Sequence, residues 1–155
     1  MVMDYTQELV FAQAILNEIA PEDQQVEKTI LKWNEPSRAV IEKEFSSWIQ
    51  ATAPYKELRI TDETLDSDCF FIALHELNAY SNREKKAIPT LRLFSIWIPE
   101  ELRRQGLASF LIEKLEEHAK QRQLQFLVGP VLEESMALLL IKRKYMRRTI
   151  LDYVY

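Results

Sequence analysis

The stretch IPEELRRQGLASFLIEKLEEHA, residues 98–119, combines an amphipathic helical pattern with a glycine in its expected first turn. Leu107, Leu111 and Leu115 recur at helical spacing and would pack the helix against a sheet. Glycine inside a helix lowers stability by about 1 kcal/mol relative to alanine, so the presence of Gly106 in this segment requires an explanation. The first backbone N–H groups of a helix lack internal partners and attract anions. We therefore interpret the segment as a loop and helix start that approach a phosphate; an ordinary helix start with solvated charges is the alternative.

The segments around this stretch predict an α/β arrangement. Short runs rich in β-branched and aromatic residues alternate with amphipathic runs. A strand, a helix and a second strand in this order imply a right-handed crossover between parallel strands. The expected elements are a strand at 90–98, a helix at about 104–121, a strand at 124–131, a helix at about 133–145 and a strand at 148–155.

The strand expected at 90–98 contains a change of phase. Leu91 and Leu93 share one phase of the two-residue alternation, whereas Phe94, Ile96 and Ile98 take the other. A β-bulge produces such a slip by inserting one extra residue. A strand buried on both faces would tolerate the same residues, so both interpretations stand.

The middle of the chain predicts a pair of antiparallel strands. KELRITDET (56–64) and CFFIALHEL (69–77) are short, rich in β-branched or aromatic residues, and joined by the turn-like LDSD (65–68). Residues 78–89 are expected to form an exposed loop, which leads into the strand that carries the phase change.

Residues 1–53 are interpreted as a helical N-terminal part, and residues 54–155 as the part that holds the sheet. Prolines separate the helical patterns, because proline cannot continue a helix. Three helices are expected, at 4–20, after Pro21 with Val26, Ile30 and Trp33 on one side, and from near Pro36 with Ile41, Phe45 and Trp48 buried.

The length and composition of the chain indicate one domain over residues 1–155. Cys69 is the only cysteine, so an internal disulfide is impossible. The N-terminus lacks the pattern of a secretion signal, and no apolar run approaches the roughly 20 residues that cross a bilayer. We expect a cytoplasmic protein without a membrane partner.

Charge is distributed unevenly along the chain, whose net charge is -4. Residues 1–68 carry 14 acidic and 6 basic side chains, a balance of -8, whereas residues 69–155 carry 10 acidic and 14 basic ones, a balance of +4. The second part is therefore the expected anion-binding half. Solvated helical faces often produce a similar asymmetry.

The central stretch, preceded by TLRLFSIW and followed by QFLVGPVLEESMALLLIKRKYM, resembles the acetyl-coenzyme A binding region of the GNAT superfamily of N-acetyltransferases. The signature of that family is Arg or Gln, two residues, Gly, one residue, then Gly or Ala. Arg103, Gly106 and Ala108 occupy these positions. The resemblance spans roughly Leu91 to Met146 and leaves the first third of the chain uncovered.

This resemblance implies a fold, an activity and a cofactor. The fold is a GNAT-like mixed α/β sheet with a splayed central strand pair, here with a helical N-terminal extension. The activity is transfer of an acetyl group from acetyl-CoA to a primary amine, by direct attack within a ternary complex. The bulge would then open a cleft for the pantetheine arm.

The resemblance also implies where the cofactor would bind. The backbone of the strand that bulges would bind the pantetheine amides, and the amides of residues 103–108 would bind the pyrophosphate. A serine near the start of the next helix is a further candidate, and no metal site is expected. The expected cofactor-binding residues are Ile96, Ile98, Arg103, Arg104, Gln105, Gly106, Leu107, Ala108 and Ser135.

The catalytic groups are the point at which this sequence departs from the family pattern. The family's general acid is a tyrosine in the second helix, and Ile141 occupies that position here. Tyr145 lies one helical turn further on and is the expected substitute acid, unless it simply packs at the helix end. Glu76 is the expected base acting through water, with Glu133 as a second candidate; both could instead be solvated or capping carboxylates.

Two other functions stay open. Because isoleucine cannot donate a proton, the chain could bind acyl-CoA without catalysis. The stretch 142–148 carries five basic residues in seven and could bind nucleic acid or an acidic protein, although a charged helix end gives the same pattern. We expect an amine-bearing small molecule or protein as the acceptor and no nucleic acid partner, and a homodimer stays open.

Overall fold

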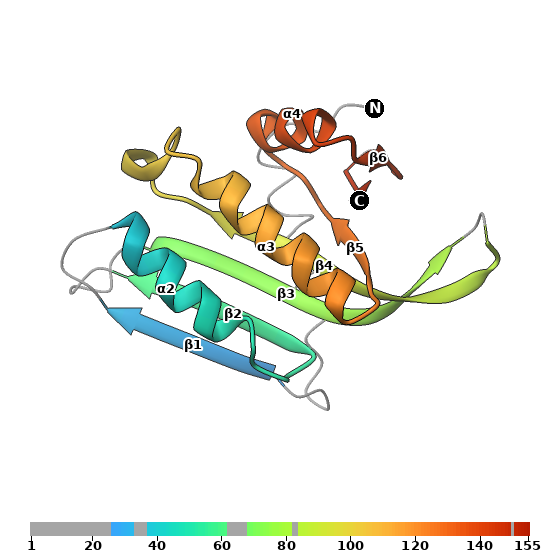
Figure 1. Ribbon diagram of the computed structural model, residues 1–155, viewed down its shortest axis with the longest axis horizontal. Helices are drawn as coiled ribbons and strands as arrows, with labels where there is room; N and C mark the ends of the chain where they lie inside the picture. Colours follow the sequence, from blue (N-terminus) through green and yellow to red (C-terminus); the bar gives the residue numbers. More distant parts are fainter. Residues whose placement is uncertain (1–25, 33–36, 62–67, 82–83, 150) are drawn as a thin grey trace.

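The computed structural model describes residues 26–32, 37–61, 68–81, 84–149 and 151–155. Among these residues, seven strands form one mixed sheet with helices packed on it (Figure 1). The order of the strands across the sheet is β1-β2-β3-β4-β5-β7-β6. The elements are β1 (Val26–Lys32), α2 (Arg38–Trp48), β2 (Tyr55–Thr61), β3 (Asp68–Ser81), β4 (Lys86–Trp97), the 3-10 helix η1 (Glu100–Leu102), α3 (Leu107–Gln121), β5 (Gln125–Val128), α4 (Glu134–Lys142), β6 (Met146–Arg147) and β7 (Tyr153–Val154).

The predicted α/β class and the predicted crossover are confirmed. Strand β4 pairs with β5 in parallel, and α3 connects them across one face of the sheet (Figure 1). Strands β2 and β3 are antiparallel, as predicted, and β3 pairs antiparallel with β4. None of the described helices is both long and apolar enough to span a membrane.

The main core lies between the sheet and the helices α2 and α3, which cover the same face. The helices contribute Phe45, Leu111 and Leu115, all completely buried, against Leu58 and Ile72 of the sheet. Replacing a buried phenylalanine by alanine costs about 3–5 kcal/mol in typical cores. This core therefore fixes α3, and with it the loop that precedes α3, against β4.

A smaller apolar cluster occupies the opposite face of the sheet. It contains Tyr55, Ala73 and Phe94, with Phe71 packed beside them. The imidazole of His75 lies between two of these rings, with centroid distances of 5.8 Å to both Tyr55 and Phe94. Apolar side chains thus cover both faces of the centre of the sheet. An apolar residue in a central strand can therefore be buried on either face.

The helix predicted after Pro21 is wrong for residues 26–32, because this segment is the strand β1. It pairs in parallel with β2, from Val26 opposite Tyr55 to Lys32 opposite Thr61. Val26 and Ile30 are four residues apart, a spacing that puts two side chains on one side of a helix and also on one face of a strand. The first predicted helix, at 4–20, lies outside the described residues, whereas the third is confirmed as α2.

The exposed loop predicted at 78–89 is also largely wrong. Strand β3 continues to Ser81 and β4 begins at Lys86, and these two residues pair with each other. The result is a long hairpin that extends beyond the rest of the sheet (Figure 1). Its side chains are mostly exposed, so its polar sequence resembles a loop even though the backbone is paired. Of the strand predicted at 148–155, the described residues form only β7, which pairs with β6 just before the predicted segment.

The predicted phase change in β4 is confirmed as a β-bulge. Ala73 of β3 pairs with Ser95, and the next residue, Leu74, pairs with Leu93, so Phe94 is the extra residue. On the other side, pairing between β4 and β5 ends where Leu93 meets Val128. The two central strands therefore part just where β4 bulges.

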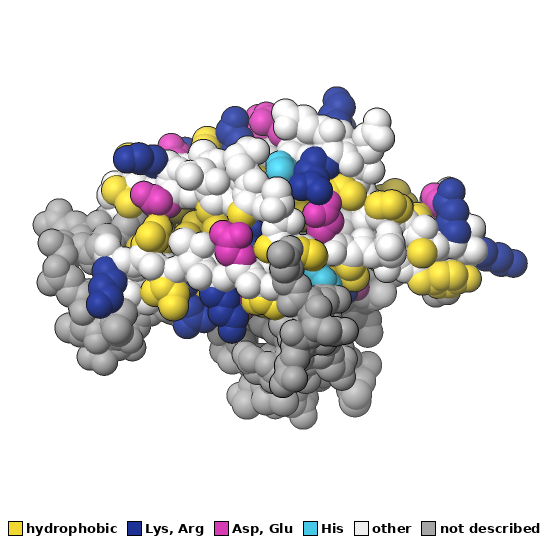
Figure 2. Space-filling model, turned by 90° about the horizontal axis from the view of Figure 1, so that it is seen from below, with side chains coloured by type: hydrophobic (Ala, Val, Ile, Leu, Met, Phe, Trp, Pro, Cys, Tyr) yellow, Lys and Arg dark blue, Asp and Glu magenta, His cyan; other side chains and the backbone are white. Residues whose placement is uncertain are grey.

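Charges on the described surface are mixed. The face in Figure 2 carries Lys and Arg side chains close to Asp and Glu side chains, without one continuous basic area among the residues coloured there. Several exposed charges form pairs, such as Arg122 with Glu76 and Lys114 with Glu117. Surface pairs of this kind contribute roughly 0–1 kcal/mol each.

Candidate functional site

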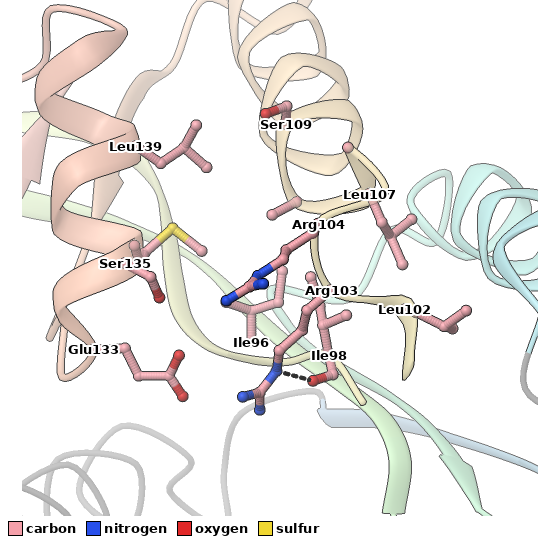
Figure 3. Close-up of a pocket in the computed structure, with 13 residues that line it drawn as sticks. Ile96, Ile98, Leu102, Arg103, Arg104, Leu107, Ser109, Glu133, Ser135 and Leu139 are labelled. Atoms are coloured by element: carbon pink, nitrogen blue, oxygen red, sulfur yellow. Dashed lines mark hydrogen bonds between the residues drawn. The ribbon is translucent and has the colours of Figure 1, made fainter. Parts of the chain in front are cut away.

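A cleft of about 420 Å³ lies between the end of β4, the start of α3 and the start of α4 (Figure 3). It opens where the sheet has parted, so its floor is β4 and its two walls are the helices. Apolar side chains dominate the lining, with two arginines at one end. The described lining residues are Ile96, Ile98, Leu102, Arg103, Arg104, Gly106, Leu107, Ala108, Ser109, Glu133, Ser135, Met136 and Leu139.

The loop before α3 has an unusual backbone. Arg104 has a φ of 66° and Gly106 a φ of 76°, both in the left-handed region. Gly106 is the N-cap of α3, which begins at Leu107, so the prediction that this glycine lies in the first turn of the helix is wrong. Glycine adopts a positive φ without steric cost, which gives a backbone reason for its presence.

The N-terminus of α3 has no side-chain cap, and its first turn contains no acidic residue. By contrast, Ser37 caps α2 by accepting a hydrogen bond from the N–H of Val40 at 3.4 Å. The helix dipole and uncapped N–H groups attract negative charge. The start of α3 is therefore suited to an anionic ligand.

Arg38 of α2 supports this loop from outside the cleft. It donates a hydrogen bond to the backbone oxygen of Gln105 and a second, at 2.7 Å, to the carboxylate of Glu42. A Cβ placed on Gly106 would lie 3.5 Å from its Nη1 atom, an ordinary contact. Sequence reasoning missed Arg38, because an arginine in a helix 67 residues upstream carries no signal of this contact.

The two arginines of the loop are arranged differently. Arg103 donates from Nε to the backbone oxygen of Ile98 at 2.9 Å, and its guanidinium carbon lies 4.7 Å from the centre of the Trp97 ring. Arg104 is exposed and projects across the cleft toward α4 in Figure 3. Together they place positive charge at the same end of the cleft as the start of α3.

A second cavity, of about 270 Å³, adjoins the first. Its lining comes from the bulged part of β4, the last residue of β5 and the segment that leads to α4. It shares Ile96, Glu133 and Met136 with the larger cleft. The other described residues that line it are Leu93, Phe94, Ser95, Trp97, Val128, Pro130, Val131 and Leu132.

Glu133 lies where the two cavities meet. It is the N-cap residue of α4, but its side chain makes no capping hydrogen bond. In Figure 3 its carboxylate faces Arg103 across the cleft. Glu133 is the only carboxylate among the described residues that line either cavity.

The structure brings nearly all of the predicted cofactor residues together. Eight of the nine line the larger cleft; Gln105 is not among its lining residues, and its backbone oxygen accepts a hydrogen bond from Arg38. Glu76, the predicted base, lies elsewhere: it pairs with Arg122 at 2.6 Å and lines neither cavity. Its catalytic role stays a prediction without geometric support.

Tyr145, the predicted acid, is buried against α3 rather than exposed to either cavity. Its hydroxyl donates a hydrogen bond of 2.5 Å to Glu116, which also accepts one from Nε of Arg143 at 3.1 Å. Burial, together with the hydrogen bond to Glu116, raises the pKa of Tyr145 above its ordinary value. Ile141 is 57% exposed and lines neither cavity. The acid role of Tyr145 stays a prediction, and its contacts favour a structural role.

Comparison with solved structures finds this fold in other proteins. A KacTA–DNA complex gives a TM-score of 0.50 at 12% identity, over 76% of this chain and 77% of that chain. A mutant of KacT gives 0.46 at 12% identity over 57% of this chain; the match spans only 62% of that chain. The aminoglycoside antibiotic 6'-N-acetyltransferase AAC(6')-Ih from Acinetobacter baumannii gives 0.43 at 19% identity, over 96% and 90% of the two chains. At such identities the likeness concerns the fold alone.

Comparison of sequences gives stronger evidence about the family than the structural comparison does. A search of curated proteins gives no match. Among protein families, however, residues 28–138 match the acetyltransferase (GNAT) family. This segment covers well over half of the chain and includes the bulged strand, the loop before α3 and the first residues of α4. The expected resemblance is thereby confirmed, and the chain belongs to the acetyltransferase (GNAT) family.

Proposed function

We propose that this protein transfers the acetyl group of acetyl-CoA to a primary amine while both molecules are bound. Acetyl-CoA is the acetyl donor that the GNAT family uses. The observation that carries the proposal is the coincidence of three features: the β4 bulge, the parting of β4 from β5, and the uncapped start of α3. Together they form one continuous cleft with a cationic end.

The residues of the cleft fit the chemistry of acetyl-CoA. Its diphosphate is anionic and suits the backbone amides of residues 103–108, assisted by Arg103 and Arg104. Its pantetheine arm is long and only weakly polar, which suits the apolar lining formed by Ile96, Ile98 and Leu139. We place Ser135 beside the arm as a hydrogen-bonding group.

The chemistry needs few protein groups. When bound, acetyl-CoA supplies a thioester carbonyl that the amine nitrogen attacks, so that a C–N bond forms, the C–S bond breaks and the CoA thiol is released. The amine must lose one proton to a base, and we assign this role to Glu133 because it lines both cavities. Positioning of the two reactants contributes several kcal/mol on its own. A thiolate leaves readily because thiol pKa values are about 8.5, so a strong general acid is not required.

A second candidate function is binding of acyl-CoA without transfer. The specific observation in its favour is that the family's tyrosine position holds Ile141, while Tyr145 is engaged by Glu116. The third function, a module that uses the basic stretch 142–148, has less support. Arg143 is paired with Glu116, and Arg148 donates to the backbone oxygen of Tyr80, so part of this charge serves the fold.

Calorimetry and a thiol-release assay separate these functions. Titration with acetyl-CoA tests the cleft, and incubation with acetyl-CoA and a panel of primary amines tests transfer. We expect saturable binding, and thiol release that depends on an amine. Binding without amine-dependent release would support the non-catalytic candidate, and absence of binding would refute both.

A matched pair of variants tests the cationic end of the cleft. Arg104→Met removes a charge that lines the cleft, whereas Lys43→Met removes an exposed charge from α2. We expect the first to weaken acetyl-CoA binding several-fold and the second to leave it unchanged. Equal effects would mean that the arginine acts only through net charge.

A further inference from the structure

We infer that the acetyl acceptor is a small primary amine carried on an apolar carbon skeleton, aromatic or branched, which binds in the second cavity. This inference rests on the proposed acetyl transfer and specifies its substrate class. It is carried by the lining, charge and size of the second cavity and by its continuity with the cofactor cleft.

Apolar side chains make up most of the lining of the second cavity. Among the described residues that line it, the side chains with hydrogen-bonding groups are Ser95, Glu133 and Trp97, whose indole N–H is a donor. A polyhydroxylated amine would bring several hydroxyl groups into a space with few side-chain partners, and each hydroxyl left unpaired opposes binding. An amine with an apolar body satisfies the lining without such a penalty.

The charges around the cavity favour a ligand with one positive charge, bound next to Glu133. Glu133 is the only ionisable side chain among the described lining residues, and it can pair with one ammonium group. Two arginines stack on the aromatic residues of the lining: Arg92 lies 4.6 Å from the Phe94 ring centre, and Arg103 lies 4.7 Å from the Trp97 ring centre. Arg92 is paired with Asp152 at 3.2 Å, which compensates its charge. Arg103 therefore carries the charge that would repel an additional ammonium group, and a polyamine is a poor fit.

The size and walls of the cavity favour a compact molecule. Its volume of about 270 Å³ is slightly below the range of roughly 300–1,000 Å³ typical of sites for drug-sized ligands. Two aromatic residues, Phe94 and Trp97, and the branched Leu132 form walls that a ring or branched chain can fill. Trp97 is 41% exposed, which leaves part of a large apolar side chain available to a ligand. A single linear lysine stem would fill this space less completely.

Continuity between the cavities gives the amine its reaction partner. Ile96, Glu133 and Met136 belong to both linings. An ammonium group bound by Glu133 therefore lies at the boundary with the cofactor cleft. It loses two protons on becoming an amide: the carboxylate can accept one, and the departing CoA thiolate takes the other. Recognition and deprotonation of the acceptor are thus assigned to one residue.

A panel of amines tests this inference on the full-length protein. The probes are 2-phenylethylamine, glucosamine, spermidine and a short peptide with one free lysine and a blocked N-terminus. Thiol release gives kcat/KM for each, and calorimetry with CoA present gives direct binding. We expect kcat/KM for 2-phenylethylamine to exceed that for each of the other probes at least tenfold.

Variants test the residues that carry the inference. Glu133→Gln should lower kcat/KM for 2-phenylethylamine at least tenfold and weaken its direct binding to the CoA-bound protein. Glu134→Gln is the matched control, because Glu134 is an adjacent exposed carboxylate that lines neither cavity. Leu132→Asn should reduce the preference for 2-phenylethylamine over glucosamine.

The outcomes distinguish this inference from the proposed function. If acetyl-CoA binds and glucosamine or spermidine is preferred, the inference is overturned and the cofactor assignment stands. Preference for the peptide would overturn it in favour of a protein acceptor. If acetyl-CoA fails to bind, the proposed function is refuted. Calorimetry of 2-phenylethylamine with the parent protein and with Glu133→Gln then still shows whether the second cavity binds an apolar amine.

Discussion

Arg38, the first residue of α2, donates a hydrogen bond to the backbone oxygen of Gln105, 67 residues further along the chain. The bond joins the first described helix to the loop before α3. The same guanidinium is held in place by Glu42, one helical turn away, at 2.7 Å. A loop with two left-handed residues needs such support, because its conformation is not maintained by regular hydrogen bonding.

We expect Arg38→Met to weaken acetyl-CoA binding by about threefold to tenfold while kcat is largely preserved. The physical reason is that Arg38 orders the loop without contacting the reacting atoms, so its loss affects binding more than chemistry. Calorimetry and saturation kinetics provide the measurement. Arg38→Lys should recover part of the affinity, and an unchanged dissociation constant in the methionine variant would show that the loop does not depend on this bond.

Substitutions of Gly106 separate a backbone effect from a steric one. The left-handed φ costs most other residues about 1–2 kcal/mol, and asparagine tolerates it better than valine does. We therefore expect Gly106→Val to abolish the thermal stabilisation by CoA, and Gly106→Asn to retain part of it. Differential scanning fluorimetry with and without CoA measures both. Equal loss in the two variants would indicate that space for the ligand, rather than φ, selects glycine.

Tyr145→Phe tests whether this hydroxyl acts in catalysis or in folding. Its hydrogen bond to Glu116 joins the end of α4 to α3, and hydrogen bonds to charged groups contribute about 1.5–3 kcal/mol. We expect a fall of this size in the free energy of unfolding, with kcat unchanged. Denaturant titration and thiol release are the measurements. Tyr155→Phe is the control, and a large fall in kcat at unchanged stability would instead support the predicted acid.

Acid should destabilise the protein through His75. Burial, and then the charge of Arg92, lower the pKa of this imidazole below its ordinary value of 6.5. The unfolded chain therefore binds the proton more tightly than the folded protein, so stability falls as the pH drops below 6.5 toward the folded pKa. We expect the melting temperature to decrease over this window.

The dependence on pH should be smaller in His75→Phe, which removes the titrating group. His118, whose pKa is lowered by burial and by the nearby charges of Lys56 and Arg122, contributes in the same direction. His118→Phe therefore serves as the comparison. If the melting temperature of His75→Phe depends on pH as steeply as that of the parent protein, His75 is not responsible.

Several features of the fold could be predicted because they depend on neighbouring residues. The phase change between Leu93 and Phe94 predicted the bulge, since side-chain alternation directly records the number of residues in a strand. The same reasoning failed at β1, where Val26 and Ile30 satisfy both helical and strand periods. It failed again in the long hairpin of β3 and β4, whose paired backbone carries mostly exposed side chains.

In the candidate site, too, some residues could be predicted from the sequence and others could not. Gly106 and its arginines were predicted because the argument for an anion site and the family motif both depend on a few consecutive residues. The positions of Tyr145 and Glu76 were not, because a helical or strand pattern says which residues share a face and not which cavity that face meets. Tyr145 lies against Glu116, 29 residues earlier, and Glu76 pairs with Arg122, 46 residues later.

The sequence by itself determined the order of elements from β4 to α4 and indicated the bulge and the resemblance to the family, because these follow from periodicity and from a short local motif. Only the tertiary structure decided that Arg38 holds the loop, that Glu133 joins two cavities and that Tyr145 is engaged elsewhere. Such contacts depend on how β4 and β5 part and on how three helices pack on the sheet. These contacts join residues that are far apart in the chain, so local sequence patterns give no information about them.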